Sequence, residues 1–158
     1  MIDPITAQIK LLSAQLNFEV RNSYTFNIFV EDNGSPPLSA LTEITVLVQD
    51  VNEQPSTPDV VLSIEENAIK YTPVSARVAA GDPDHNEELN FFFVNHKAEI
   101  FVIEACNGQI TVNKPVIDYE STPAYFMTIT VTDSGGLTDT GTVTIQVLDV
   151  NETPEIAP

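Results

Sequence analysis

The sequence predicts an all-β protein built from tandem Greek-key β-sandwich repeats of immunoglobulin-like topology, with the first repeat truncated. Two observations predict the fold class. Apolar residues recur with a period of two, in short segments that Gly, Pro, Asp and Asn turns separate. The chain also holds 11 prolines and shows no convincing helical periodicity. About seven such strands in about a hundred residues are typical of a two-sheet sandwich.

A third observation, internal repetition, gives the domain organisation. The segment 24–32 (YTFNIFVED) recurs at 125–133 (YFMTITVTD), and Asp50-Val51-Asn52-Glu53 recurs at 149–152. The offset between the two copies changes only in the loop after Asp32, and loops accommodate differences in length. We therefore expect residues 1–53 to be the C-terminal half of a repeat, 54–152 a complete repeat, and 153–158 the start of a linker to another, in a fragment of a longer protein.

The alternating apolar residues give the strands in chain order, and we interpret them as core residues. One strand is expected to end near Ala79. The expected strands are 24–30, 44–48, one beginning around Val60 and Leu62, that ending near Ala79, one around Phe91 and Phe93, 125–131 and 143–147.

The charge balance limits the partners. The chain has 23 Asp and Glu against 6 Lys and Arg, a net charge of −17. Such a chain repels nucleic acid and anionic membranes and attracts cations. The alternative interpretation is that the acidic residues only keep the protein soluble. No stretch approaches the roughly 18 apolar residues of a membrane span, so a membrane is reached only through other parts of a parent chain. The single cysteine, Cys106, excludes an internal disulfide and is expected in a turn or the core.

The acidic residues gather at strand ends and in loops. In Asp82-Pro83-Asp84 the two carboxylates are two residues apart, so both point to one side of an extended segment. Oxygen ligands without Cys or His suit Ca²⁺, which takes about 6 to 8 oxygens. An EF-hand is excluded, because Glu87 stands where that loop needs Gly and Phe93 where it needs Glu. The alternative is that the acidic residues of these turns only cap backbone N–H groups and keep the protein soluble.

These motifs, in this order, resemble a cadherin repeat. The resemblance covers the whole second copy and the first copy from residue 6 onward. Its motifs are Glu66-Asn67, Asp82-Pro83-Asp84, Gly108-Gln109-Ile110, Asp118-Tyr119-Glu120, the segment 131–135 and the linker Asp149-Val150-Asn151-Glu152-Thr153-Pro154, with counterparts at 6–9, 17–19, 31–34 and 50–55.

The resemblance implies Ca²⁺ ions between consecutive repeats. The sequence departs from the family pattern at Asn17, which replaces an Asp. It also departs at Glu53 and Glu152, whose side chains are one methylene longer than the Asp of the family's linker. His85 and His96 are expected to be loop residues rather than ligands. One implied site uses Glu19, Asp50, Val51, Asn52, Glu53, Gln54, Asp82, Asp84 and Asp133, with Val51 and Gln54 through their carbonyls. Half of a downstream site uses Glu66, Asp118, Glu120, Asp149, Asn151 and Glu152.

The resemblance further implies an extracellular, calcium-dependent adhesion module on the cell surface. Its expected partners are calcium and other ectodomains of the same type, above all its own kind. Three alternatives stay open: a structural spacer without adhesion, a sugar-binding sandwich and a hydrolase with paired carboxylates. The absence of Trp counts against sugar binding, and carboxylates in short surface loops count against a hydrolase.

Overall fold

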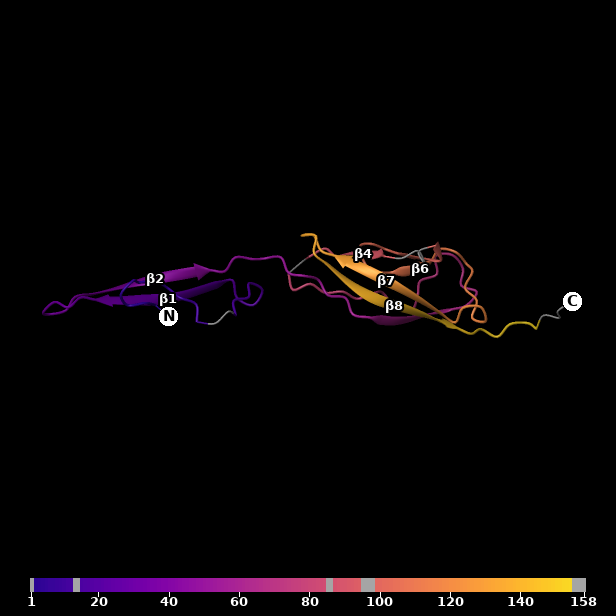
Figure 1. Cartoon of the computed structure of the whole chain (residues 1–158), viewed down its shortest axis with the longest axis horizontal. Coiled ribbons are helices and arrows are strands. Elements are labelled where there is room, and N and C mark those ends of the chain that lie inside the picture. Colours follow the sequence, from indigo (N-terminus) through magenta and orange to yellow (C-terminus); the bar gives the residue numbers. More distant parts are fainter. Residues whose placement is uncertain (1, 13–14, 85–86, 95–98, 155–158) are drawn as a thin grey trace. The chain divides into compact units, whose positions relative to one another are not determined.

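The computed structural model describes residues 2–12, 15–84, 87–94 and 99–154 (Figure 1). His85 and His96 lie outside the described residues. The chain divides into two compact units, Met1–Val51 and Asn52–Pro158. Each is described by itself.

The first unit is built on one β-hairpin. Strand β1 (Ser23–Glu31) pairs antiparallel with β2 (Ser39–Leu47), and Tyr24 lies opposite Val46. The expected strand at 24–30 is therefore present, extended by one residue at each end. The other expected strand, 44–48, covers only the second half of β2, because Ser39 to Glu43 carry little apolar alternation for the sequence to reveal.

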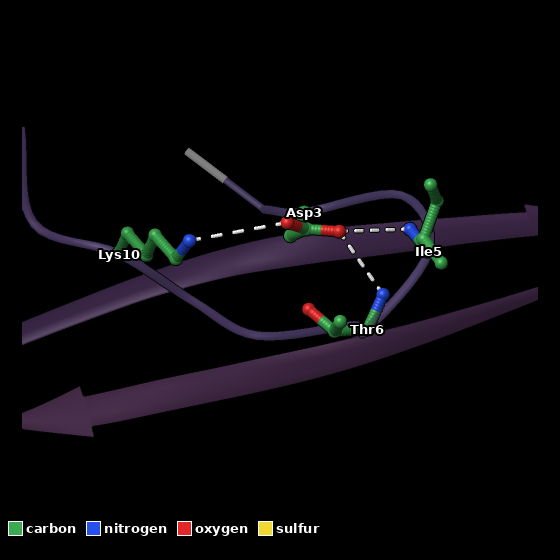
Figure 2. Close-up of polar contacts among 4 residues, drawn as sticks. All are labelled: Asp3, Ile5, Thr6 and Lys10. Atoms are coloured by element: carbon green, nitrogen blue, oxygen red, sulfur yellow. Dashed lines mark hydrogen bonds and ion pairs between the residues drawn. The ribbon is translucent and has the colours of Figure 1, made fainter.

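A tight turn precedes the hairpin, and Asp3 organises it. Its Oδ1 accepts hydrogen bonds from the N–H of Ile5 (2.9 Å) and of Thr6 (3.0 Å), while Lys10 Nζ lies 3.9 Å from Oδ2 (Figure 2). The backbone N–H groups of Thr6 and Ile5 lower the pKa of Asp3. The turn ends at Ala7, whose φ of 55° lies in the left-handed region that favours glycine.

The second unit holds two sheets of strands. One sheet has the order β3-β8-β7-β4, with β3 and β8 parallel and the other pairs antiparallel, and Figure 1 shows β4, β7 and β8 side by side. The other sheet pairs β5 with β6. The strands are β3 (Val60–Glu65), β4 (Asn90–Phe93), β5 (Phe101–Ile103), β6 (Ile110–Val112), β7 (Ala124–Thr132) and β8 (Thr138–Leu148).

The prediction of a strand ending near Ala79 is wrong. Residues 72–78 run beside 108–112, where the N–H of Val74 donates to the Ile110 carbonyl at 3.0 Å, but they form no regular ladder. Two local features break the extended chain: Tyr71 has a φ of 72°, and Pro73 has no N–H to donate. The contact with the second sheet therefore consists of single hydrogen bonds and an isolated bridge.

The core of the second unit lies between the two sheets. The inward side chains of β7 and β8 meet those of β5 and β6, and the ring of Phe101 packs edge-to-face on Tyr125 with centroids 5.1 Å apart. The fully buried side chains with the largest volumes are Phe101, Ile110, Met127, Ile129, Ile145, Val112, Val131 and Val143. This is the packed interior that period-two alternation predicts.

The two units contain the same hairpin. Tyr24 pairs with Val46 in the first, and Tyr125 pairs with Ile145 in the second, at the same sequence offsets at which the chain repeats itself. The preceding turn also matches, because Gly108 (φ 68°) takes the conformation of Ala7. The N–H of Asp3 donates to the Gln8 carbonyl, as Glu104 donates to Gln109.

The matched hairpins differ in how much of their inward face is buried. Phe26 is 37% exposed, whereas its counterpart Met127 is 1% exposed. In the first unit these inward side chains line an open hollow of about 730 Å³ together with Leu11, Leu12 and Leu16. In the second unit the corresponding face packs against Leu62, Ile64 and Phe91, among others.

Candidate metal centres

Acidic side chains gather at both ends of the second unit. At its N-terminal end, the linker residues Asn52 and Glu53 lie against two loops, one containing Asp84 and the other Asp133. The Asn52 side-chain amide donates to Asp133 Oδ2 at 2.9 Å, and the Glu53 N–H donates to Asp84 Oδ2 at 2.9 Å. The N–H of Asp84 in turn donates to Asp82 Oδ1 at 2.9 Å. Residues distant in sequence are thus held together by hydrogen bonds to carboxylates.

Asp133 directly follows β7 and is 4% exposed. Burial alone would raise its pKa. The hydrogen bonds from the Asn52 amide and from the N–H groups of Leu137, Gly136 and Gly135 outweigh burial, so the pKa of Asp133 lies below its ordinary value. Asp133 is therefore held as an anion, the form that a cation requires.

Gly135 gives the linker its place. A Cβ built on Gly135 would lie 2.3 Å from Asn52 Oδ1 and 2.5 Å from Asn52 Cγ. Any larger residue would therefore displace the Asn52 side chain from Asp133. The sequence contains Gly135 as part of a motif, but nothing in the sequence indicates which side chain needs the space.

The pair Asp82 and Asp84 fits a cation. Asp82 Oδ2 and Asp84 Oδ1 are shielded from solvent and accept no hydrogen bond from any residue that the structure describes. A shielded carboxylate oxygen without a donor is unfavourable unless a cation or a water molecule binds it, and a cation also neutralises its charge. The donor set of this end is entirely oxygen, the ligand that Ca²⁺ takes in about 6 to 8 places. The residues present therefore fit calcium.

The remaining residues expected at this end differ in position. Gln54 is exposed and its Nε2 donates to the Thr138 carbonyl at 2.7 Å. Glu19, Asp50 and Val51 belong to the first unit. There a carboxylate oxygen of Glu19 lies within 4.8 Å of one of Asp50, and Val51 is exposed.

The C-terminal end of the second unit carries another acidic cluster. Carboxylate oxygens of Glu66, Asp118 and Glu120 all lie within 4.8 Å of one another. Glu66 follows β3, and the other two stand in the loop before β7. The fold brings the ends of these segments together because β3 and β7 both pair with β8.

Glu66 is the buried member of this cluster, 4% exposed. Its Oε2 accepts the N–H of Tyr119 at 2.9 Å, and its Oε1 accepts the N–H of Val150 at 2.7 Å. Glu66 thus joins the loop before β7 to the segment after β8. Each bond is charge-assisted and stronger than a neutral one.

The cluster is crowded with negative charge. A hydrogen bond from the backbone of Glu120 lowers the pKa of its own carboxyl, but burial, the charges of Glu66 and Asp149, and a hydrogen bond with Asp118 together raise it above its ordinary value. A hydrogen bond from the Ser121 hydroxyl lowers the pKa of Asp118. A cation bound here would offset this repulsion between carboxylates.

The linker beyond β8 is also engaged. Glu152 Oε1 accepts the side-chain amide of Asn67 at 2.6 Å, while Asp149 and Asn151 are exposed. Asn67, just after Glu66, has a φ of 58°, in the left-handed region. The sequence identifies Glu66-Asn67 as a motif, but the bond of Asn67 to the linker was not predicted.

A family model supplies the decisive comparison. The model of the cadherin domain matches residues 61–148. The chain belongs to the cadherin family. It is a cadherin-type module of all-β fold, and its cadherin relatives are adhesion proteins rather than enzymes. Among the described residues, no helix has the length and apolarity that crossing a membrane requires.

The relatives are much longer cadherins and protocadherins. Human protocadherin Fat 4 is 35% identical over 96% of this chain, and human cadherin-18 is 36% identical over 90%. The protocadherin-like wing polarity protein stan of Drosophila melanogaster is 31% identical over 95%. The matched parts are 3%, 20% and 4% of those proteins, so the chain spans a small share of their length.

Solved cadherin structures share the fold. Extracellular cadherin domains 1–5 of protocadherin gamma B2 match 87% of this chain and 27% of that one, with a TM-score of 0.71 and 29% identity. Domains 3–6 of the same protein match 85% of this chain and 34% of that one, with a TM-score of 0.74 at 23% identity, which shows the fold alone.

Proposed function

We propose that this chain is a calcium-binding adhesion module of an extracellular protein at the cell surface. The observation that carries the proposal is the pair of shielded oxygens, Asp82 Oδ2 and Asp84 Oδ1, which accept no hydrogen bond from the described residues. The second acidic cluster, around Glu66, stands at the opposite end of the β3-β8-β7-β4 sheet. Calcium at both ends supports a role as one element of a rod whose junctions stiffen when the metal binds.

The proposed ligands follow the cadherin resemblance. Asn52, Glu53, Asp82, Asp84 and Asp133 bind calcium at the N-terminal end, with the carbonyl of Gln54. We include Glu19, Asp50 and the carbonyl of Val51 as ligands of the same junction. The downstream half-site consists of Glu66, Asp118, Glu120, Asp149, Asn151 and Glu152.

The number of ions follows from the carboxylates. Ca²⁺ affinity depends on the charge of the ligands and on the rigidity of the site. Asn17 removes one carboxylate that the family has, so we expect one or two ions to bind near Asp82, with weaker binding at the half-site. Isothermal titration with CaCl₂ measures this number. Three tightly bound ions at the N-terminal end would contradict the ligand assignment.

The direct test removes the two shielded carboxylates. Calcium stabilises the folded chain by mass action, by about 2.7 kcal/mol at 100 times its Kd. We expect Asp82→Ala with Asp84→Ala to abolish most of the calcium-induced rise in Tm. The matched control is Glu104→Ala with Glu99→Ala, two exposed glutamates outside both clusters, which should keep the rise. An undiminished rise in the double variant of Asp82 and Asp84 would refute the site.

A second variant tests the geometry without removing a carboxylate. Gly135→Ala should weaken the tightest calcium-binding step, because the added methyl displaces Asn52 from Asp133. Gly136→Ala is unsuitable as its control, since Gly136 has a φ of 91°. Gly81→Ala is suitable, because a Cβ there meets nothing within 4 Å. Equal calcium affinity in Gly135→Ala and Gly81→Ala would show that the position of Asn52 does not matter.

The alternative is a calcium-binding spacer without adhesion. It predicts the same calcium titration but no self-association. Sedimentation velocity with and without calcium therefore separates the two functions.

A further inference from the structure

The chain contains two Asn-Gly pairs, and the structure places them in different surroundings. Asn33-Gly34 lies in the loop that joins β1 to β2, and Asn107-Gly108 lies in the turn that joins β5 to β6. Glycine has no Cβ, so its backbone nitrogen can approach the side-chain amide carbon of the preceding asparagine. Attack of that nitrogen on the amide carbon is intramolecular, and correct positioning of the reacting groups therefore controls its rate.

The first pair is open to solvent and its asparagine is unrestrained. Asn33 and Gly34 are both exposed. Within the part of the chain that the structure describes, no residue makes a hydrogen bond to the Asn33 side chain. Its amide carbon, Cγ, is therefore free to turn toward the nitrogen of Gly34 and is accessible to water.

A carboxylate already accepts the proton of the attacking nitrogen. The N–H of Gly34 donates to Asp32 Oδ1 at 3.0 Å, and the N–H of Leu38 donates to the same oxygen at 2.9 Å. The N–H groups of Leu38 and Gly34 lower the pKa of Asp32, so it is ionised at neutral pH. A general base has to lie about 2.6–3.2 Å from the atom whose proton it removes. Asp32 meets this requirement.

The second pair is restrained. Asn107 Oδ1 accepts the N–H of Gln109 at 2.9 Å, and Asn107 Nδ2 donates to Glu104 Oε2 at 2.7 Å. The N–H of Gly108 donates to the backbone carbonyl of Glu104 at 3.0 Å, and a carbonyl is a much weaker base than a carboxylate. Gly108 is also buried. Both the side chain and the nitrogen of this pair are therefore held in other bonds.

The corresponding loop of the second unit has the same frame without the asparagine. The N–H of Leu137 donates to Asp133 Oδ1 at 2.8 Å, so Asp133 closes this loop as Asp32 closes the first. Ser134 occupies the position of Asn33 and offers no amide carbon for attack. Of these two equivalent loops, only the first combines the carboxylate with an Asn-Gly pair.

We propose that Asn33 is a modification site, at which Asp32 acts as general base and the chain converts its own asparagine to aspartate and isoaspartate. The nitrogen of Gly34 bonds to Asn33 Cγ while its proton passes to Asp32. The bond between Cγ and Nδ2 then breaks, and Nδ2 leaves as ammonia with that proton. Water opens the resulting five-membered succinimide at either of its carbonyls, so water is the only other reactant.

The products change the loop in two ways. Each adds a negative charge next to Asp32, which is unfavourable because like charges repel. Isoaspartate also lengthens the backbone by one methylene between Asp32 and Gly34. One oxygen of Asp32 then no longer matches the N–H groups of both Gly34 and Leu38, and the end of the hairpin loses part of its closure.

The test is incubation of the full chain at neutral pH in calcium-free buffer, so that the result does not depend on the proposed metal centres. Peptide mapping by mass spectrometry measures conversion at both asparagines of the same molecule. Asp-N protease distinguishes the products, because it cleaves at aspartate and not at isoaspartate. We expect Asn33 to convert at least about tenfold faster than Asn107, since a positioned general base contributes about 10²- to 10⁴-fold.

A substitution of the base separates its effect from exposure. Asp32→Asn keeps the size of the side chain and should slow conversion of Asn33 at least about tenfold, while Asn107 is unaffected. The matched control is Glu31→Gln, which removes an exposed carboxylate two residues from Asn33 and should leave its rate within about twofold. Unchanged hydrogen exchange in β1 shows that the variants are folded.

Unfolding gives a measurement that needs no variant. In concentrated urea both pairs lose their surroundings and should convert at similar rates, more slowly than Asn33 and faster than Asn107 in the folded chain. Equal conversion of the two asparagines in the folded chain, an unchanged rate at Asn33 in Asp32→Asn, or aspartate without isoaspartate would overturn the proposal.

Discussion

Glu66 offers a quantitative test of how the acidic cluster supports the fold. Glu66→Ala removes a carboxylate that is 4% exposed and whose two oxygens both accept hydrogen bonds. The N–H groups of Tyr119 and Val150 then lose their acceptors. A hydrogen bond to a charged group contributes about 1.5–3 kcal/mol, so two contribute about 3–6 kcal/mol. Glu66→Gln keeps one acceptor oxygen and should lose about half as much.

The assay is hydrogen exchange of the Val143 and Ile145 amides in the core strand β8, in calcium-free buffer so that metal binding does not contribute. Every 1.4 kcal/mol accelerates exchange about tenfold, which gives about 10²- to 10⁴-fold for Glu66→Ala. The matched control is Glu65→Ala, because Glu65 is exposed and should change stability by less than about 0.5 kcal/mol. Equal exchange in Glu65→Ala and Glu66→Ala would refute the role of these two bonds.

Two further predictions concern glycine and exposure. Gly108→Ala should destabilise the second unit by about 2–3 kcal/mol in urea unfolding, because φ is 68° and a Cβ would lie 2.7 Å from the Val78 carbonyl oxygen; a loss below about 0.5 kcal/mol would contradict this. Amides of β1 and β2 should exchange much faster than those of β7 and β8, since inward residues such as Phe26 are exposed in the first unit. Equal protection in monomeric protein would show that the exposed inward face does not weaken the hairpin.

The hairpins could be predicted from the sequence because two signals agree there. Alternation gives the strands, and internal repetition gives their equivalence, so the expected 125–131 lies within Ala124–Thr132. The strand expected near Ala79 failed for a local reason. The left-handed conformation of Tyr71 leaves no mark in an alternation of apolar residues, since Tyr71 is not a glycine.

The acidic residues of the candidate sites could be selected from the sequence, but their bonds could not. The motif resemblance grouped Glu66 with Asp118 and Glu120, and the structure places their oxygens within 4.8 Å. The bond from Val150 to Glu66 joins residues 84 positions apart, and neither residue type signals it. The same holds for the space that Gly135 provides for Asn52.

The bonds of Glu66 link the fold of the second unit to its proposed metal chemistry. Both acceptor oxygens are used by backbone N–H groups, one before β7 and one after β8, so the carboxylate is held in place before any cation binds. Ligands positioned in this way lose little conformational freedom on binding calcium, which raises affinity. The same bonds fix the start of the linker, since Val150 belongs to the segment that contains Asp149, Asn151 and Glu152. In the proposed function, calcium at this end would act on a linker that the fold has already begun to order, and replacing Glu66 should lower both stability and calcium affinity.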